Sequence, residues 1–190
     1  MKTRLHLITV VALCCSLSGC HNPWMEKVLV ALYRIGDTGP GGGIVFYRSA
    51  KGFTMTDTGE TCYFLEAAPV DLVTYVWASS AYTNTDIPGT GISIGSGRQN
   101  TARILSADSA APAAYACKNY TGGGKTDWFL PSFYELNELC KQNAVVGGYY
   151  TYWSSSQYDS ANAWTMTFYL YPSAFFKNTN FTYVRAIRAF

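Results

Sequence analysis

The strongest constraint on the fold is the pattern of aromatic residues near the end of the chain. From Tyr149 to Phe190, 14 of 42 residues are aromatic. Within this region two sets of residues alternate, Trp164, Met166, Phe168 and Leu170 with Thr165, Thr167, Tyr169 and Tyr171. This period of two predicts a strand with one apolar face and one face of Thr and Tyr. The final residues, TYVRAIRAF, predict another strand, which must be paired in a sheet to stay ordered at a chain end.

Shorter strands are predicted nearer the N-terminus. The apolar runs from Val28 to Ile35, from Ile44 to Tyr47 and from Tyr63 to Ala67 have the length of strands. The first two runs are separated by GDTGPGGG, Gly36 to Gly43, where five glycines and one proline predict a tight turn with positive φ angles. Only two triplets of this stretch fit a collagen repeat, which is too few for a triple helix.

Three helices are predicted in the middle of the chain. Arg98 to Ala107 has helical periodicity, with Ala102, Ile104 and Leu105 on or near one face, and Pro112 to Tyr120 begins with a proline in its first turn. The third helix begins after Ser132, and Glu135 completes a capping box. Its core face consists of Phe133, Leu136, Leu139 and Cys140.

The first 19 residues have the order of a secretory signal. Lys2 and Arg4 precede an apolar run from Leu5 to Leu17, which is too short for a permanent membrane span. Leu17-Ser18-Gly19-Cys20 resembles the lipobox of bacterial lipoproteins. We therefore expect a signal peptide at 1–19, a lipid on Cys20, a tether at 20–27 and one domain at 28–190. An ordinary secretory signal that happens to contain Cys20 is the alternative.

The charge of the expected mature chain argues against nucleic acid as a partner. Without Lys2 and Arg4, 12 basic and 12 acidic residues remain, so the formal net charge is zero. Binding to nucleic acid usually requires a basic stripe, and the sequence has none. The expected membrane contact is the lipid on Cys20, which places the protein in the bacterial cell envelope, at the surface of the outer membrane.

Three cysteines remain for the folded domain. Cys14 and Cys15 belong to the signal, and Cys20 carries the lipid, which leaves Cys62, Cys117 and Cys140. Cys117 and Cys140 lie on neighbouring predicted helices and are the favoured disulfide pair in an oxidising compartment. Three buried thiols are an equally acceptable interpretation, because free cysteine is a common core residue.

The familiar catalytic motifs are absent from the sequence. NYTGGGKT has Asn119 where a phosphate-binding loop requires glycine, and a predicted helix precedes it instead of a strand. GISIGSG, Gly91 to Gly97, lacks the glycine spacing of a dinucleotide fingerprint. The two histidines, His6 and His21, lie in the signal and the tether, so a Ser-His-Asp triad or a histidine metal site is excluded from the domain. We expect no catalytic residues, no metal and no cofactor.

The composition of the C-terminal quarter is the feature of the sequence that indicates a function. Tyrosine offers a large contact area with little rotamer entropy to lose, and Asn and Ser add adaptable hydrogen bonds. These residues are typical of a recognition surface, and a tyrosine-rich face that only covers the core is the alternative. We expect Trp153 and Trp164 in the core, and we expect Arg185 and Arg188 to form ion pairs within the protein.

Six stretches in order resemble the Lcl C-terminal domain family of bacterial surface proteins and lipoproteins. They are YRIGDTGPGGGIVFY (Tyr33 to Tyr47), FLEAAP (Phe64 to Pro69), IGSGRQNTARIL (Ile94 to Leu105), GGGKTDWFLPSFYELNEL (Gly122 to Leu139), YWSSSQYDSANAW (Tyr152 to Trp164) and YVRAIRAF (Tyr183 to Phe190). The resemblance implies a C-type-lectin-like α+β fold of the formylglycine-generating-enzyme branch, with two to three helices and small twisted antiparallel sheets, in which the first and last strands pair. The calcium-dependent sugar motifs of true C-type lectins are absent.

The resemblance also implies where a ligand would bind. In some similar proteins retroelements diversify this C-terminal segment on a constant scaffold. The scaffold here would include Trp153, Ser154, Ser155, Ser156 and Trp164. The contact positions would be Gln157, Tyr158, Asp159, Asn162, Thr165, Thr167, Tyr169, Tyr171, Phe176 and Asn178. The expected function is binding of a protein or glycan ligand, as in an adhesin or receptor. The alternatives are an enzyme of the formylglycine-generating branch and an envelope structural protein.

Overall fold

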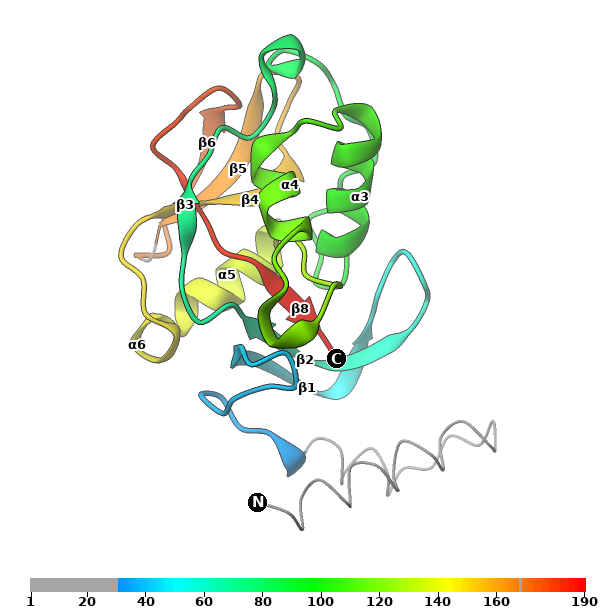
Figure 1. Ribbon diagram of the computed structural model, residues 1–190, viewed down its shortest axis with the longest axis vertical. Coiled ribbons are helices and arrows are strands. Elements are labelled where there is room, and N and C mark those ends of the chain that lie inside the picture. Colours follow the sequence, from blue (N-terminus) through cyan, green and yellow to red (C-terminus); the bar gives the residue numbers. More distant parts are fainter. Residues whose placement is uncertain (1–30, 168) are drawn as a thin grey trace.

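The computed structural model describes residues 31–167 and 169–190. The expected signal peptide, Cys20, the tether and residues 28–30 lie outside the described residues. The described chain combines two small sheets with several helices, so the prediction of an α+β fold is confirmed (Figure 1). Residues 31 and 32 are helical and no strand follows them before Thr38, so the predicted strand up to Ile35 is wrong where it can be checked.

The smaller sheet has three strands in the order β1-β2-β8, with β1 at Ile44–Thr54, β2 at Thr61–Ala67 and β8 at Ile187–Ala189. Both pairings are antiparallel. The expectation that the first and last strands pair is corrected here. β1 pairs with one side of β2 and β8 pairs with the other, so β2 lies between the first and last strands.

The larger sheet has five strands in the order β3-β7-β4-β5-β6. Their bounds are Leu72–Thr74 for β3, Thr151–Gln157 for β4, Asn162–Thr167 for β5, Pro172–Phe176 for β6 and Tyr183–Val184 for β7. Three of its pairings are antiparallel, but β4 and β7 run parallel, which the expectation of purely antiparallel sheets did not include.

The three predicted helices are present as α3 (Gly97–Ala107), α4 (Pro112–Lys118) and α5 (Phe133–Lys141). The capping box of α5 is confirmed, since Ser132 and Glu135 exchange both hydrogen bonds. The sequence did not indicate α6 (Asn143–Val146) or the short 3-10 helices η1 (Ser80–Tyr82) and η2 (Gly122–Gly124). On α3 the buried face includes Asn100, Thr101 and Ile104, whereas Ala102 is exposed.

The glycine-rich turn wraps around a buried carboxylate. Glu66 on β2 is fully buried and accepts hydrogen bonds from the backbone N–H groups of Gly41 and Gly43. A Cβ atom at Gly39, Gly41 or Gly43 would lie within 3 Å of that carboxylate, so these positions require glycine for the close approach. Gly36 and Gly42 have the predicted positive φ angles, 94° and 73°.

The core consists of two clusters of buried side chains. The first joins both sheets to α5 through residues such as Phe46, Tyr152 and Leu136. The second lies under α3 and α4, around Trp77 and Trp128. Cys140 belongs to the first cluster, Cys117 belongs to the second, and both are free thiols like Cys62. The favoured Cys117–Cys140 bridge is therefore wrong, and the interpretation as three buried thiols holds.

The alternation of the C-terminal quarter does not extend as far as predicted. The strand β5 ends at Thr167, and Leu170 adopts a φ angle of 61° in the turn before β6. Within β5, Thr165 of the predicted polar face is fully buried and Trp164 of the predicted apolar face is only half-buried, whereas Met166 is buried as predicted. The two faces therefore do not differ in burial as the sequence suggested. The Thr165 hydroxyl compensates for its burial by donating to the Ser173 carbonyl at 3.1 Å.

Candidate binding surface

The scaffold beneath the candidate surface is a run of buried polar residues on β4. Ser154, Ser155 and Ser156 are fully buried, and their hydroxyls donate to the carbonyls of Trp164, Pro131 and Gly91. Trp153 beside them is also fully buried, as expected. These bonds fix β4 against the loop before α3 and the loop before α5, so the residues that follow β4 project from a rigid base.

The ten predicted contact residues do not form one surface. Thr165 is buried and is withdrawn from the set, because a ligand cannot reach it. Thr167, Tyr169 and Tyr171 lie at the β5–β6 turn, while the others lie at the opposite end of the same strands: Gln157, Tyr158, Asp159, Asn162, Phe176 and Asn178. The six residues of β5 separate the two groups by about 17 Å.

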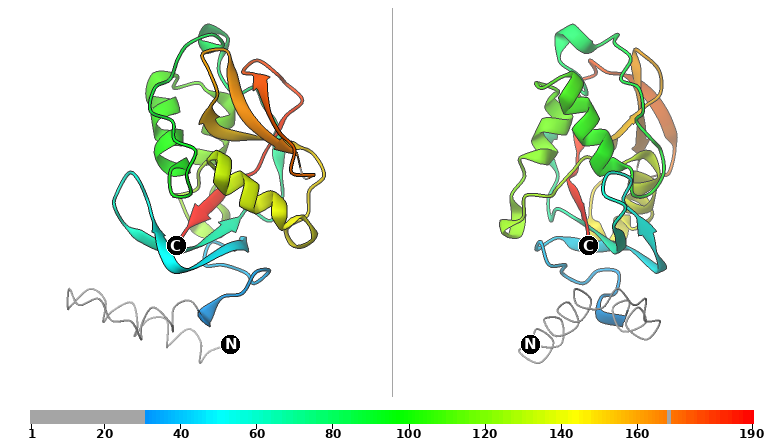
Figure 2. Two further views of the ribbon diagram at one scale, coloured as in Figure 1. Left: turned by 180° about the vertical axis from the view of Figure 1, so that it is seen from behind. Right: turned by 90° about the vertical axis from the view of Figure 1, so that its right-hand side faces the viewer.

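The second group belongs to what we call the distal end, formed by residues 80–90, 157–162 and 176–180. Figures 1 and 2 show these segments at one end of the long axis, with residue 31 and the C-terminus at the other. The distal end is therefore the part of the described protein that lies farthest from the N-terminal side.

Four aromatic rings form a continuous row that reaches the distal end. Tyr134 contacts Phe133 at 5.3 Å between ring centroids, Phe133 contacts Trp164 at 4.9 Å, and Trp164 contacts Tyr158 at 4.7 Å. Tyr134 is 45% exposed and Tyr158 is 56% exposed. We call these four residues the aromatic strip. Phe176, 65% exposed, lies beside it on the same sheet face, because it is opposite Asn162 in register.

Of the four residues of the aromatic strip, the sequence identified only Tyr158 as a contact residue. It placed Phe133 and Trp164 in the core, although both are half-buried and form the middle of the row. Tyr134 was not singled out, and the available signal was its place outside the apolar stripe of α5. The strip joins α5 to β5, and no local pattern predicts that these elements meet.

Several predicted contact residues have their polar atoms engaged within the protein. Asp159 accepts hydrogen bonds from the backbone N–H groups of Ala161 and Asn162 and from the Asn162 amide. Burial acts to raise the pKa of Asp159, but these hydrogen bonds outweigh it, and the pKa is lowered. Gln157 accepts from Ile87 and Lys177 and donates to Asp86. These three residues shape the distal loops and leave the exposed rings for contact.

Lys177 links the loops of the distal end through buried hydrogen bonds. It is fully buried, and its Nζ donates to Thr85, Gln157 and Ser160, each at 2.7 Å. The ammonium also lies 4.9 Å from the centre of the Trp77 ring. Burial lowers the pKa of Lys177 to about 8, against the opposing influence of the nearby acidic residues, so the group is still charged at pH 7. Its three protons match the three acceptors.

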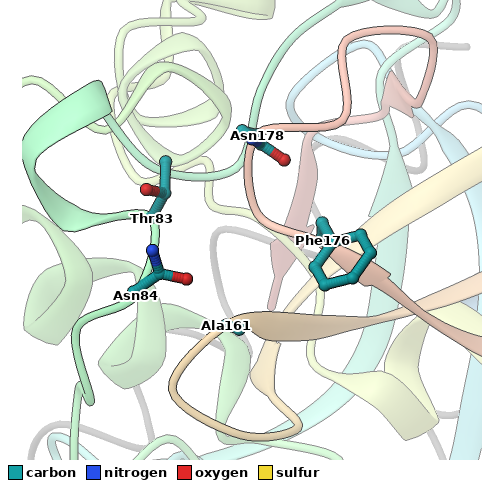
Figure 3. Close-up of a pocket in the computed structure, with 5 residues that line it drawn as sticks. All are labelled: Thr83, Asn84, Ala161, Phe176 and Asn178. Atoms are coloured by element: carbon teal, nitrogen blue, oxygen red, sulfur yellow. The ribbon is translucent and has the colours of Figure 1, made fainter.

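A hollow of about 250 Å³ opens at the distal end between Thr83, Asn84, Ala161, Phe176 and Asn178. Figure 3 shows Thr83 and Asn84 on one side of the hollow and the Phe176 ring on the other, with Asn178 between them at the top. Neither carboxamide is hydrogen-bonded to any residue that the structure describes. The lining is entirely neutral, which favours polar but uncharged groups in a ligand.

The other tyrosines form a separate cluster near the β5–β6 turn. Tyr169 and Tyr171 are 79% and 69% exposed, and Tyr149 is 82% exposed in the loop before β4. Tyr150 stacks on Tyr183 with 3.9 Å between ring centroids. Since Thr151 pairs with Thr167, this loop and the β5–β6 turn lie at the same end of the sheet.

The cysteines offer little nucleophilic chemistry. Burial raises the pKa of Cys62 to about 11 and that of Cys140 to about 12, and it raises the pKa of Cys117 as well. Reactive cysteines have lowered pKa values, because the thiolate is the nucleophile. Among residues 31–167 and 169–190, no group of three His, Cys, Asp or Glu side chains is placed to hold a metal ion.

Comparison with known proteins adds no relative. No protein-family model matches the chain, and no curated protein matches it. Within the described part of the chain, no helix is both long enough and apolar enough to cross a bilayer.

Proposed function

We propose that the protein is a bacterial surface lipoprotein that binds a macromolecular ligand, protein or glycan, at its distal end. The aromatic strip is the observation that carries this proposal. Exposed tyrosines and a half-buried tryptophan in mutual contact supply rigid area at low entropic cost, and such residues dominate binding energy at interfaces. With a lipid on Cys20, the strip would lead toward the side of the protein away from the membrane.

The proposal includes the C-type-lectin-like fold and membership of the Lcl C-terminal domain family. Its support is the ordered series of sequence stretches, together with the α+β architecture and the C-terminal strand that closes the first sheet. The position of β2 between the terminal strands is a departure from the expected pairing. An enzyme of the formylglycine-generating branch would need a reactive thiol in a cleft, and the raised thiol pKa values do not favour one.

The test compares two matched double variants of the full chain. Glycan arrays and arrays of extracellular proteins would first identify a bound probe. Tyr158→Ala with Phe176→Ala should then weaken that binding by about a hundredfold or more, because two exposed aromatic contacts are lost. Tyr169→Ala with Tyr171→Ala removes two even more exposed rings from the other cluster and should leave binding within a few-fold.

Melting temperatures within a few degrees of the unaltered protein would establish that both variants fold. If the Tyr169/Tyr171 variant loses binding while the Tyr158/Phe176 variant keeps it, the distal end is not the binding surface. If no probe binds at all, the envelope structural protein becomes the better interpretation.

A further inference from the structure

The outer edge of β6 has free backbone groups, which follows from its register with β5. Lys177 N–H donates to Ala161 and Thr167 N–H donates to Tyr171, both in the register that pairs Ala163 with Phe175. Hydrogen-bonded pairs alternate along an antiparallel ladder. The residues at 173 and 175 therefore face β5, and those at 172, 174 and 176 point their backbone groups outward.

Four outward groups have no partner among the described residues. They are the carbonyls of Pro172 and Ala174 and the N–H groups of Ala174 and Phe176. The Phe176 carbonyl is engaged, since it accepts from Thr179 N–H at 2.8 Å. Pro172 fits this arrangement, because proline is tolerated on an edge strand where the missing N–H would point outward.

This edge lacks most of the features that normally prevent pairing with another chain. Natural edge strands are protected by charged side chains, bulges or covering segments. The sequence of β6, Pro-Ser-Ala-Phe-Phe, has no charge, and its pairing with β5 is regular throughout. Proline at the start of the strand is one protective feature, and two residues whose backbone groups face outward, Ala174 and Phe176, follow it.

The surroundings of the edge match the chemistry of a polypeptide. Phe176 lies on the edge strand itself, and Trp164 lies one strand further in on the same sheet face, so an added strand would place alternate side chains against Phe176 at the margin of the aromatic strip. The free carboxamides of Asn84 and Asn178 stand near the end of β6 (Figure 3). Each carboxamide offers a donor and an acceptor, which complement the C=O and N–H of a peptide group. A glycan has no regular series of N–H donors and carbonyl acceptors to match β6.

We propose that an extended segment of a partner protein binds here as an added strand, hydrogen-bonded to Ala174 and to its neighbours Pro172 and Phe176. The inference rests on the proposed function of the distal end and narrows its ligand to a polypeptide. The added strand places its apolar side chains on Phe176 and the aromatic strip, and the neutral hollow accepts uncharged residues beyond the end of β6.

The probe for the test is a display library of random 12-residue peptides, selected on the full chain. Amide hydrogen exchange then compares the free protein with the protein bound to a selected peptide. Exchange at Ala174 and Phe176 should slow by at least about tenfold, because both N–H groups gain acceptors. Two versions of each peptide are then compared, each methylated on a different set of alternate backbone nitrogens. The version methylated on the nitrogens that face β6 should lose binding, and the other version should keep it.

Variants at one position give an independent check. Ala174→Pro removes an outward N–H without touching the bonds to β5, and it should weaken the selected peptides by about tenfold or more. Ala174→Val keeps the N–H and adds a similar volume, so it should bind almost as the unaltered protein does.

Three results would overturn the inference. The first is that selected peptides bind without slowing exchange at Ala174 and Phe176 and tolerate methylation at every nitrogen. The second is that glycans alone bind; a loss of that binding in the Tyr158/Phe176 variant would then leave the proposed function intact. The third is that light scattering reveals a dimer of the chain alone in which the two amides already exchange slowly, so that a second copy occupies the edge. If methylated peptides report pairing with β6 but the Tyr158/Phe176 variant binds normally, the edge inference stands and the strip is not the binding surface.

Discussion

Two buried glutamates organise neighbouring parts of the protein in the same way. Glu66 collects the N–H groups of the glycine-rich turn, and Glu135 collects those of Gly95 and Ser132 at the start of α5. Arg188 neutralises Glu66 at 2.9 Å, whereas no ion pair reaches Glu135 in the described chain. Burial accordingly raises the pKa of Glu135 to about 7, although the hydrogen bonds to its carboxylate act in the opposite sense.

The raised pKa of Glu135 predicts a pH dependence of stability. Between pH 4.5 and 7 the folded state binds more protons than the unfolded state, so the free energy of unfolding should fall as pH rises through this window. The contribution of this group is about 3 kcal/mol. Chemical denaturation at pH 4.5 and 7.5 measures it, and Glu135→Gln should remove this part of the slope.

The matched control is Glu138→Gln, on the same helix. Glu138 pairs with Lys141 at a partly exposed site, so its loss should cost less than about 1 kcal/mol and leave the slope unchanged. A Glu135→Gln variant with the full slope of the unaltered protein would assign the pH dependence to other groups.

At the scale of secondary-structure elements, the sequence predicts the features that are determined by residues close together in the chain. The capping box and apolar stripe located α5, and Pro112 located the start of α4. The same reasoning extended β5 too far, because Tyr169 and Tyr171 continue the alternation through a turn that Leu170 makes with a positive φ angle. It placed Thr165 on an exposed face, because residue type alone does not show that the Thr165 hydroxyl donates a hydrogen bond to the Ser173 carbonyl. The aromatic strip depends on packing between α5 and β5, which periodicity does not reveal.

The register of β6 predicts that substitution by proline has different effects at two neighbouring positions. Ser173→Pro removes an N–H that faces β5 and should lower the free energy of unfolding by about 3 kcal/mol or more. Ala174→Pro removes an N–H that faces outward and should cost about 1 kcal/mol, mainly from a change in φ. Chemical denaturation of the two variants measures the difference. A larger loss for Ala174→Pro would show that the ladder is offset by one residue, and equal losses would contradict the inward and outward assignment of the two N–H groups.

At the scale of the whole molecule, two arginines hold the sheets and loops together. Arg185 is almost fully buried and donates to Asp71 and to the carbonyls of Ala68 and Val146. Arg188 bonds to Glu66 at 2.9 Å and to Asp127 at 2.6 Å. The prediction that both arginines pair internally is confirmed. Their partners could not be named from the sequence, because Asp71 and Glu66 lie more than a hundred residues away along the chain.

Arg185 should therefore be far more important for stability than an arginine on the surface. Arg185→Met leaves Asp71 and two carbonyls short of a donor in the interior and should lower the free energy of unfolding by about 3 kcal/mol or more. Arg103→Met, on the exposed side of α3, should change it by less than about 0.5 kcal/mol. Thermal and chemical denaturation compare the two, and similar losses would contradict the role given to Arg185.

The last residue lies at the same end of the described protein as residue 31, and this position has a practical consequence. Phe190 accepts hydrogen bonds from the N–H groups of Tyr63 and Phe64, which brings the last residue to the same end as residue 31. A biosensor chip or fluorescent label attached after Phe190 would thus sit on the opposite pole from the Phe176 ring. Antibodies raised against residues 80–90 should compete with a captured peptide, whereas antibodies against the β1–β2 hairpin should leave it in place.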